Sequence, residues 1–315
     1  MRRVVMNFAR YLVPGSSVAF WHTPIAPVFY DFPTLGDYFI DFTSKTAYKG
    51  PFDARGIPLL NYRGSIGTRY NPCATAQYAL GWYQRWRRGD EGGKERFFTM
   101  ADWLRDTLEA DNQGQGFWFY DFDLDAYGAR APWASALAQA QGVAVLLRAA
   151  RASSNAHYAR AAASAYAAMT SPVERGGLLL RRGDLVFLEE VVSDRPTAIL
   201  DGYIFAMFGV RDYAFYTGDS ASVELWNACV RTLAQLLPEY DLGYWSRADL
   251  YNRTPPMPAS AFYHGLHIAQ LKVLERLASN SIFGEYANRW EMLASNRISG
   301  LRVLLSKIYF KLRYY

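Results

Sequence analysis

A chain of 315 residues, 51% hydrophobic and 20% charged, has enough apolar side chains to fold around a core, which excludes an intrinsically disordered protein. Aromatic residues reach 16%, and a net charge of +5 with a pI near 9.0 favours an acidic partner. We expect no nucleic acid among its partners, because the sequence has no zinc-finger spacing, no RNA-binding aromatic signature and no long run of lysine and arginine.

The first 60 residues contain prolines throughout and are predicted to form an irregular N-terminal arm. No stretch near the start resembles a secretory signal, and no apolar run in the sequence is long enough to cross a membrane. These features favour a cytoplasmic protein without a transmembrane segment.

From residue 61 to residue 297, apolar residues recur at helical spacing in four pairs of segments. The first helices of the pairs are predicted over Pro72–Arg87, Pro132–Arg151, Pro196–Tyr216 and Ser260–Ser279. The second helices are predicted over Glu95–Ala110, Asn155–Met169, Ser220–Leu237 and Ile282–Ser295. This tandem of αα-hairpins predicts an all-α toroid, an incomplete α/α barrel of about four hairpins, with the first helices forming the inner wall.

A small β-hairpin is predicted between the second and third helix pairs. Residues 177–188 have the pattern of two short strands around an Arg182-Gly183-Asp184 turn. This hairpin would bring Glu189 and Glu190 to one end of the ring.

The last residues, 298–315, are predicted to form a basic amphipathic helix. One interpretation is that this helix packs on the outside of the ring. The other is that it contacts a membrane surface or a partner. A homodimer is also left open by the sequence.

Isolated polar residues interrupt the otherwise apolar inner helices. Such buried groups need partners, so they either bond to one another or line a wet cavity. They are Gln77, Gln139, Gln141, Asp201, His264, His267 and Gln270. Cysteines 73 and 229 lie far apart, and the two neighbouring histidines lack further ligands, so we expect no disulfide framework, no metal and no cofactor.

Tyr263, His267 and Gln270 are spaced four and three residues apart and share one helix face. Together with other segments in the same order, this stretch resembles the C-terminal catalytic domain of the D-glucuronyl C5-epimerases, which convert glucuronate to iduronate in heparan-type chains. The resemblance covers about residues 70–293. Its matching segments are Tyr70–Pro72, Ala76–Leu80, Pro132–Gly142, Glu189-Glu190, Leu200–Tyr203, Leu237–Asp241 and Tyr263–Leu271.

The resemblance implies an α-helical toroid that inverts carbon 5 of D-glucuronyl units in an acidic, uronate-containing polysaccharide. It assigns proton exchange at carbon 5 to Tyr263 and an acid or base role to Glu190. Two departures from the family pattern are Val191, where a tyrosine commonly follows the glutamate pair, and Ala248, where a second catalytic tyrosine is usual.

Tyr244 and Tyr251 lie in the same loop as Ala248, and we expect one of them to replace the second catalytic tyrosine. The substrate carboxylate must be neutralised before carbon 5 loses its proton, and Arg247 and Arg253 are predicted to do this. The full set of predicted substrate-binding residues is Tyr70, Gln139, Gln141, Asp201, Arg247, Arg253, His264 and His267.

Two alternatives stay open at this point. A uronate polysaccharide lyase shares the first proton abstraction and then expels the group at carbon 4. A noncatalytic carbohydrate-binding relative would account for Val191 and Ala248. Because one fold can host several activities, the helical toroid cannot decide between these functions.

Overall fold

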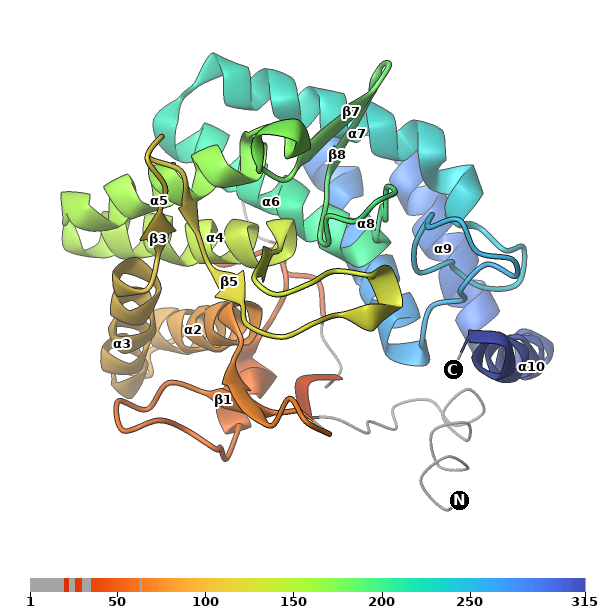
Figure 1. Cartoon of the computed structure of the whole chain (residues 1–315), viewed down its shortest axis with the longest axis horizontal. Helices are drawn as coiled ribbons and strands as arrows, with labels where there is room; N and C mark the ends of the chain where they lie inside the picture. Colours follow the sequence, from red (N-terminus) through yellow and green to blue (C-terminus); the bar gives the residue numbers. More distant parts are fainter. Residues whose placement is uncertain (1–19, 23–25, 30–34, 63, 315) are drawn as a thin grey trace.

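The computed structural model of the protein describes residues 20–22, 26–29, 35–62 and 64–314. This part is mostly helical, and its strands form only two-stranded sheets (Figure 1). Helices that follow one another pack as four hairpins. They are α2 (Pro72–Arg87) with α3 (Gly92–Asp106), α4 (Ala136–Ser153) with α5 (Ala156–Thr170), α6 (Leu200–Thr217) with α7 (Ser220–Tyr240), and α8 (Ala261–Ala278) with α9 (Ser281–Ser295).

The first helix of each hairpin forms the inner wall. α2 packs on α4, α4 on α6 and α6 on α8, while α3, α5, α7 and α9 lie around the outside (Figure 1). α8 and α2 are not among the closely packed pairs of the described residues, so the ring is incomplete. The predicted all-α toroid of αα-hairpins is confirmed.

The inner helices α2, α4 and α8 begin at a polar capping residue, whereas α6 follows Ile199 without a side-chain cap. The side chains of Asn71, Ser135 and Ser260 each accept a hydrogen bond from the backbone N–H three residues further on. The predicted starts at Pro132 and Pro196 are wrong by four residues. Trp133 and Ala134 instead form a strand, and the backbone just before α6 is extended.

Four antiparallel two-stranded sheets lie before or between the helices of the ring in the chain order. They are β1 (Leu59–Asn61) with β2 (Thr68–Tyr70), β3 (Glu109–Ala110) with β4 (Gly116–Phe117), β5 (Phe119–Tyr120) with β6 (Trp133–Ala134), and β7 (Leu179–Arg182) with β8 (Leu185–Leu188). The last of these is the predicted insertion. It lies beside α6 and α7, and β8 ends directly before the glutamate pair (Figure 1).

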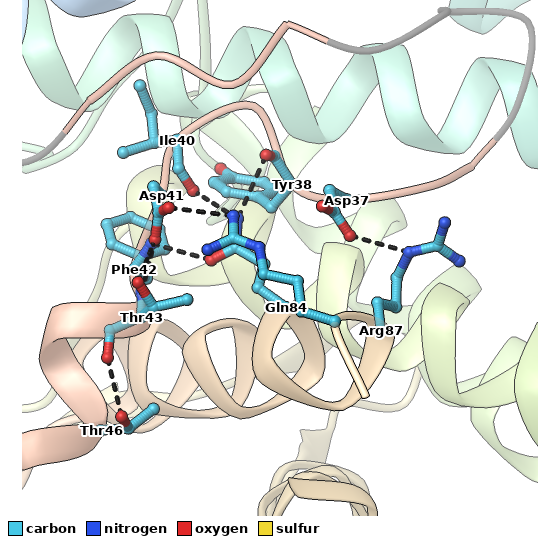
Figure 2. Close-up of polar contacts among 10 residues, drawn as sticks. Asp37, Tyr38, Ile40, Asp41, Phe42, Thr43, Thr46, Gln84 and Arg87 are labelled. Carbon is cyan, nitrogen blue, oxygen red and sulfur yellow. Dashed lines mark hydrogen bonds and ion pairs between the residues drawn. The ribbon is translucent and has the colours of Figure 1, made fainter. Parts of the chain in front are cut away.

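The segment before β1, which belongs to the predicted irregular N-terminal arm, enters the core. Tyr38 and Phe42 are buried, and a short 3-10 helix, η2 (Thr43–Ala47), packs on α2. Figure 2 shows how Gln84 of α2 holds this segment. Its side-chain oxygen accepts a hydrogen bond from the Phe42 N–H at 2.8 Å, and its amide nitrogen donates to the Ile40 carbonyl at 2.9 Å. The inner wall therefore dictates where η2 lies.

The last helix, α10 (Arg297–Tyr314), packs on α9 (Figure 1). It leaves an apolar stripe exposed. The stripe residues are each more than half exposed. They are Ile298, Leu301, Leu305, Tyr309 and Leu312. Among the described residues, no helix has the length and apolar character that crossing a membrane requires.

A buried ion pair joins two inner helices to the N-terminal segment. Arg148 of α4 donates to Asp212 of α6 at 2.6 Å and to the carbonyl of Gly36 at 2.9 Å. Burial raises the pKa of Asp212 even though Arg148 opposes the shift. The pair therefore depends on both partners being present.

Replacing Arg148 with Met should lower the free energy of unfolding by about 3–5 kcal/mol, because Asp212 would stay buried without its cation. Lys272 provides a surface control: it bonds to Glu291 at 2.8 Å, and Lys272→Met should cost less than about 1 kcal/mol. Urea denaturation of both variants measures the difference. Equal, small costs would show that the buried pair does not hold the helices together.

Candidate functional site

A cavity of about 350 Å³ opens at the N-terminal ends of the inner helices. Such a volume lies at the lower end of the range for small-molecule sites. Each inner helix contributes residues from its first two turns. They are Cys73, Ala74 and Gln77 of α2, Leu137 of α4, Asp201 and Phe205 of α6, and Phe262, Tyr263 and Leu266 of α8. Because helix N-termini carry partial positive charge, this end of the ring favours an anion.

Aromatic side chains make up much of the cavity wall. Tyr120 and Trp133, from the β5–β6 hairpin, stack at 4.3 Å between ring centroids, and Tyr62 joins them from the β1–β2 loop. The Tyr62 hydroxyl accepts a hydrogen bond from the Asn71 side-chain amide at 2.6 Å. Flat rings and hydroxyl groups of this kind can stack on and bond to a sugar.

The two glutamates after β8 have different environments. Glu189 is buried, and one of its carboxylate oxygens accepts bonds from the backbone N–H groups of Thr197 and Ala198 at 3.1 Å. It therefore braces the start of α6. Glu190 lines the cavity, and its buried Oε2 has no hydrogen-bond partner among the described residues. Neighbouring residues of an extended chain point in opposite directions, which explains the division.

Glu190 packs directly on α6 at a glycine. A Cβ atom at Gly202 would lie 2.0 Å from its Oε2 atom and 2.7 Å from its Cβ atom, so only glycine leaves room for it there. Burial raises the pKa of Glu190 well above its usual range, and the charges of Asp201 and Glu189 raise it further. A carboxyl group with a raised pKa is a stronger base when ionised.

Tyr263 stands in the first turn of α8, where its N–H donates to Ser260. Its side chain lines the same cavity as Glu190 and Asp201, and none of the described residues bonds to its hydroxyl. Burial, then the charges of Asp201 and Glu190, raise the pKa of this phenol well above its usual value. The phenol is therefore protonated at neutral pH and is a candidate proton donor.

Comparisons with known proteins identify the family of this chain. Residues 111–292, more than half of the chain, match the family model described as D-glucuronyl C5-epimerase C-terminus. The chain belongs to the D-glucuronyl C5-epimerase family. The matched part includes Glu190, Asp201, Gly202 and Tyr263.

Two curated relatives match 62% of this epimerase-family chain. An uncharacterized protein of Methanocaldococcus jannaschii is 28% identical over 202 residues, and the D-glucuronyl C5-epimerase of Caenorhabditis elegans is 27% identical over 217 residues. The matched regions are 64% and 34% of these relatives' lengths. Among solved structures, an unsaturated glucuronyl hydrolase from Bacillus sp. GL1 aligns with a TM-score of 0.45 and 17% identity, over 73% of this chain and 62% of its own.

Several residues predicted to bind substrate in this family member instead hold the fold together. Gln139 bonds to the backbone N–H of Trp118 and the carbonyls of Gly116 and Ala165. Gln141 is fully buried beside Cys73. Neither amide lines the described cavity. Gln139 satisfies backbone groups of neighbouring elements, whereas the Gln141 side-chain oxygen accepts from the Cys73 thiol at 3.3 Å.

The histidine pair is also structural. His264 stacks on Trp245 and bonds to the Trp290 carbonyl at 3.1 Å, and burial lowers its pKa to about 3. The Ser246 hydroxyl lies 2.8 Å from His264 and 2.9 Å from His267. The His267 Nε2 atom lies 3.7 Å from an Asp201 carboxylate oxygen, which is too long for a hydrogen bond, and His267 does not line the cavity.

The residues predicted from the loop before α8 lie elsewhere. Tyr244 bonds to Ser306 of α10 at 2.9 Å, and Tyr251 contacts Asp194. Arg247 donates to the Tyr251 carbonyl, and Arg253 pairs with Asp249 at 3.4 Å. None of these four residues lines the described cavity. The polar groups of this loop bond to one another and to neighbouring elements. The four residues therefore do not lie at the described site.

Tyr70 and the two family departures also lie outside the cavity lining. The exposed Tyr70 bonds to Asp53 at 2.8 Å. Val191 is buried in a small apolar cluster with Tyr127, and the Ala248 carbonyl accepts from the first N–H of α6. The tyrosines that do line the cavity, besides Tyr263, are Tyr62 and Tyr120, and no motif pointed to them.

The close contact between Glu190 and α6 predicts the effect of a single methyl group. Gly202→Ala should lower the free energy of unfolding by about 1–3 kcal/mol through overpacking. Gly265 of α8 faces open space, so Gly265→Ala should raise it by up to about 1 kcal/mol. Combining Gly202→Ala with Glu190→Ala should recover part of the loss, as a double-mutant cycle by thermal denaturation would show. If the two losses of unfolding free energy simply add in the double variant, the contact between Glu190 and Gly202 is contradicted.

Proposed function

We propose that this protein inverts carbon 5 of D-glucuronyl units in an acidic polysaccharide, forming L-iduronyl units. One observation carries the proposal: Glu190 and Tyr263 line one cavity at the positive ends of four helices, in a chain matched by the epimerase family. The substrate is anionic, so the helix N-termini and the net charge of +5 both favour its binding.

The proposed chemistry is a proton exchange at carbon 5. Ionised Glu190 removes the hydrogen from carbon 5 as a proton. The electron pair of the broken carbon–hydrogen bond moves toward the adjacent carboxylate of the sugar. Tyr263 then gives a proton to carbon 5 on the opposite face of the ring. Glu190 then holds the proton it took and Tyr263 has lost its own, so exchange with water resets both groups. The raised pKa values suit these roles, because the carboxylate binds a proton more strongly and the phenol keeps its proton until it is needed.

A lyase reaction is the second candidate, since it shares the abstraction step. After abstraction the lyase must protonate and expel the oxygen at carbon 4, which leaves a double bond between carbons 4 and 5. The cavity contains three phenols and two carboxyl groups within one small space, so a proton donor for either outcome is present. The family match favours epimerisation.

Incubating glucuronate-containing polysaccharides with the protein in heavy water tests the proposal. Proton NMR should show deuterium entering carbon 5, together with new iduronate signals. Tyr263→Phe should slow the exchange by at least about 10²-fold, because the proton donor is lost while the ring stays. Tyr70→Phe, which alters an exposed phenol outside the cavity, is the matched control and should keep the wild-type rate.

Two outcomes would contradict this function. A rise in ultraviolet absorbance from an unsaturated sugar, with chain cleavage, would assign the protein to the lyases. Uronate binding without any exchange would assign it to the noncatalytic carbohydrate-binding proteins.

We further propose that α10 rests on an anionic membrane surface. Four cations flank its exposed apolar stripe, and the helix contains no acidic residue. They are Arg297, Arg302, Lys311 and Arg313. Apolar side chains with basic residues on both sides are typical of helices that lie in the lipid interface. A second copy would bring the same cations to this face, so the charge disfavours a dimer through α10.

Co-sedimentation with vesicles tests this contact. The full chain should pellet with vesicles of equal parts phosphatidylcholine and phosphatidylserine, and less so at high salt. Leu305→Glu should weaken binding by roughly tenfold or more, since burying a leucine contributes about 1.5–3 kcal/mol. Met292→Glu, on the exposed side of α9, is the control. A soluble wild type, or a dimer that Leu305→Glu dissociates, would overturn the proposal.

A further inference from the structure

A buried lysine of the N-terminal segment lines the cavity. Lys45 belongs to η2 and is 1% exposed. Its ammonium group donates a hydrogen bond to the Trp21 carbonyl and lies 5.6 Å from the Trp21 ring centroid and 5.8 Å from that of Phe262. Phe262 precedes Tyr263 on α8, and Lys45 and Tyr263 line the same cavity.

This ammonium group has no carboxylate partner within 4.0 Å among the described residues. The cavity contains two carboxyl groups, Glu190 and Asp201, yet neither pairs with it. An ammonium has three N–H donors, and the Trp21 carbonyl accepts one of them. Burying a cation without a counter-charge is costly, so its retention at the wall of a cavity indicates that an anion binds there.

Contacts with the inner helix α2 fix the position of Lys45. Gln84 of α2 holds the backbone of residues 40 and 42 immediately before η2 (Figure 2). Asp41 accepts bonds from the N–H and hydroxyl groups of Thr43 at 2.7 and 2.6 Å, which starts the short helix. A Cβ atom at Gly81 would lie 2.4 Å from the Phe42 carbonyl oxygen, so α2 and this segment touch. The lysine is therefore anchored to the same helices that carry the site.

We propose that Lys45 binds the carboxylate of the uronate unit and so selects an anionic sugar over a neutral one. This role rests on the proposed function for the reaction itself, and it concerns how the protein recognises the sugar. Pairing with the ammonium group would also withdraw charge from the substrate carboxylate, which makes the hydrogen on carbon 5 more acidic. Lys45 takes the role that the sequence pattern suggested for Arg247 and Arg253.

Binding should weaken as the solution becomes alkaline. Burial lowers the pKa of Lys45 to about 8 in the unliganded protein, and a bound carboxylate would raise it again. A group whose pKa rises on binding makes its full contribution to the binding free energy below the pKa of the unliganded protein. That contribution is lost as the pH rises through the higher pKa of the complex. The other titratable groups of the cavity are His22, Tyr62, Cys73, Tyr120, Glu190, Asp201 and Tyr263. Burial also raises the pKa of Cys73, which leaves its thiol neutral in this range.

Calorimetric titration of the full chain with two oligosaccharides tests the proposal. One contains glucuronate, and the other is the same oligosaccharide with each carboxylate reduced to an alcohol. Lys45→Met should weaken binding of the glucuronate form by roughly tenfold or more and leave the neutral form within about twofold. Lys45→Arg should retain the preference. Lys49→Met, at an exposed lysine of the same segment, is the matched control.

The melting temperature provides a second measurement. Lys45→Met replaces an unpaired buried cation with an apolar chain of similar length, so it should not lower the melting temperature. Equal affinity of wild type for the two oligosaccharides, or equal losses for both in Lys45→Met, would overturn the role of Lys45. Absent deuterium exchange with the uronate preference intact would instead overturn only the epimerase reaction.

Discussion

Every inner helix of this protein must begin at the same end of the ring, because each αα-hairpin carries the chain up one helix and back along the other. The partial positive charges of four N-termini therefore converge, and the cavity opens there. The rest of the site follows from this constraint. Asp201 and Tyr263 reach the cavity because each lies in the first turn of its helix.

The cavity has an unusual balance of charge. It collects carboxyl groups at the end of the ring that favours anions, and burial keeps Glu190 prone to hold its proton. An anionic sugar enters such a site more readily if a cation offsets the carboxyl groups. Lys45 is the lysine that lines it among the described residues, and the N-terminal segment supplies it. The segment before the hairpins is thus part of the site.

Polar residues on the inner wall divide into two groups. Some of them, such as Gln77 and Asp201, line the cavity, whereas others satisfy buried backbone, as Gln139 does for Trp118 and Gln84 for Phe42. Glu189 and Glu190 show the same division between adjacent residues. A polar residue in an apolar helix therefore indicates burial with a partner, and the face of the helix on which it lies decides whether it meets backbone or the cavity.

Sequence alone determined the helical periodicity, the pairing of helices and the two segments that contain Glu190 and Tyr263, because these depend on local spacing and on motifs. It could not place the loop after α7, where Tyr244, Tyr251, Arg247 and Arg253 turn toward their own neighbours. It also missed Lys45, which lies in a proline-rich segment without periodicity. Only tertiary structure decided these positions, since what a side chain faces depends on elements far away in the chain.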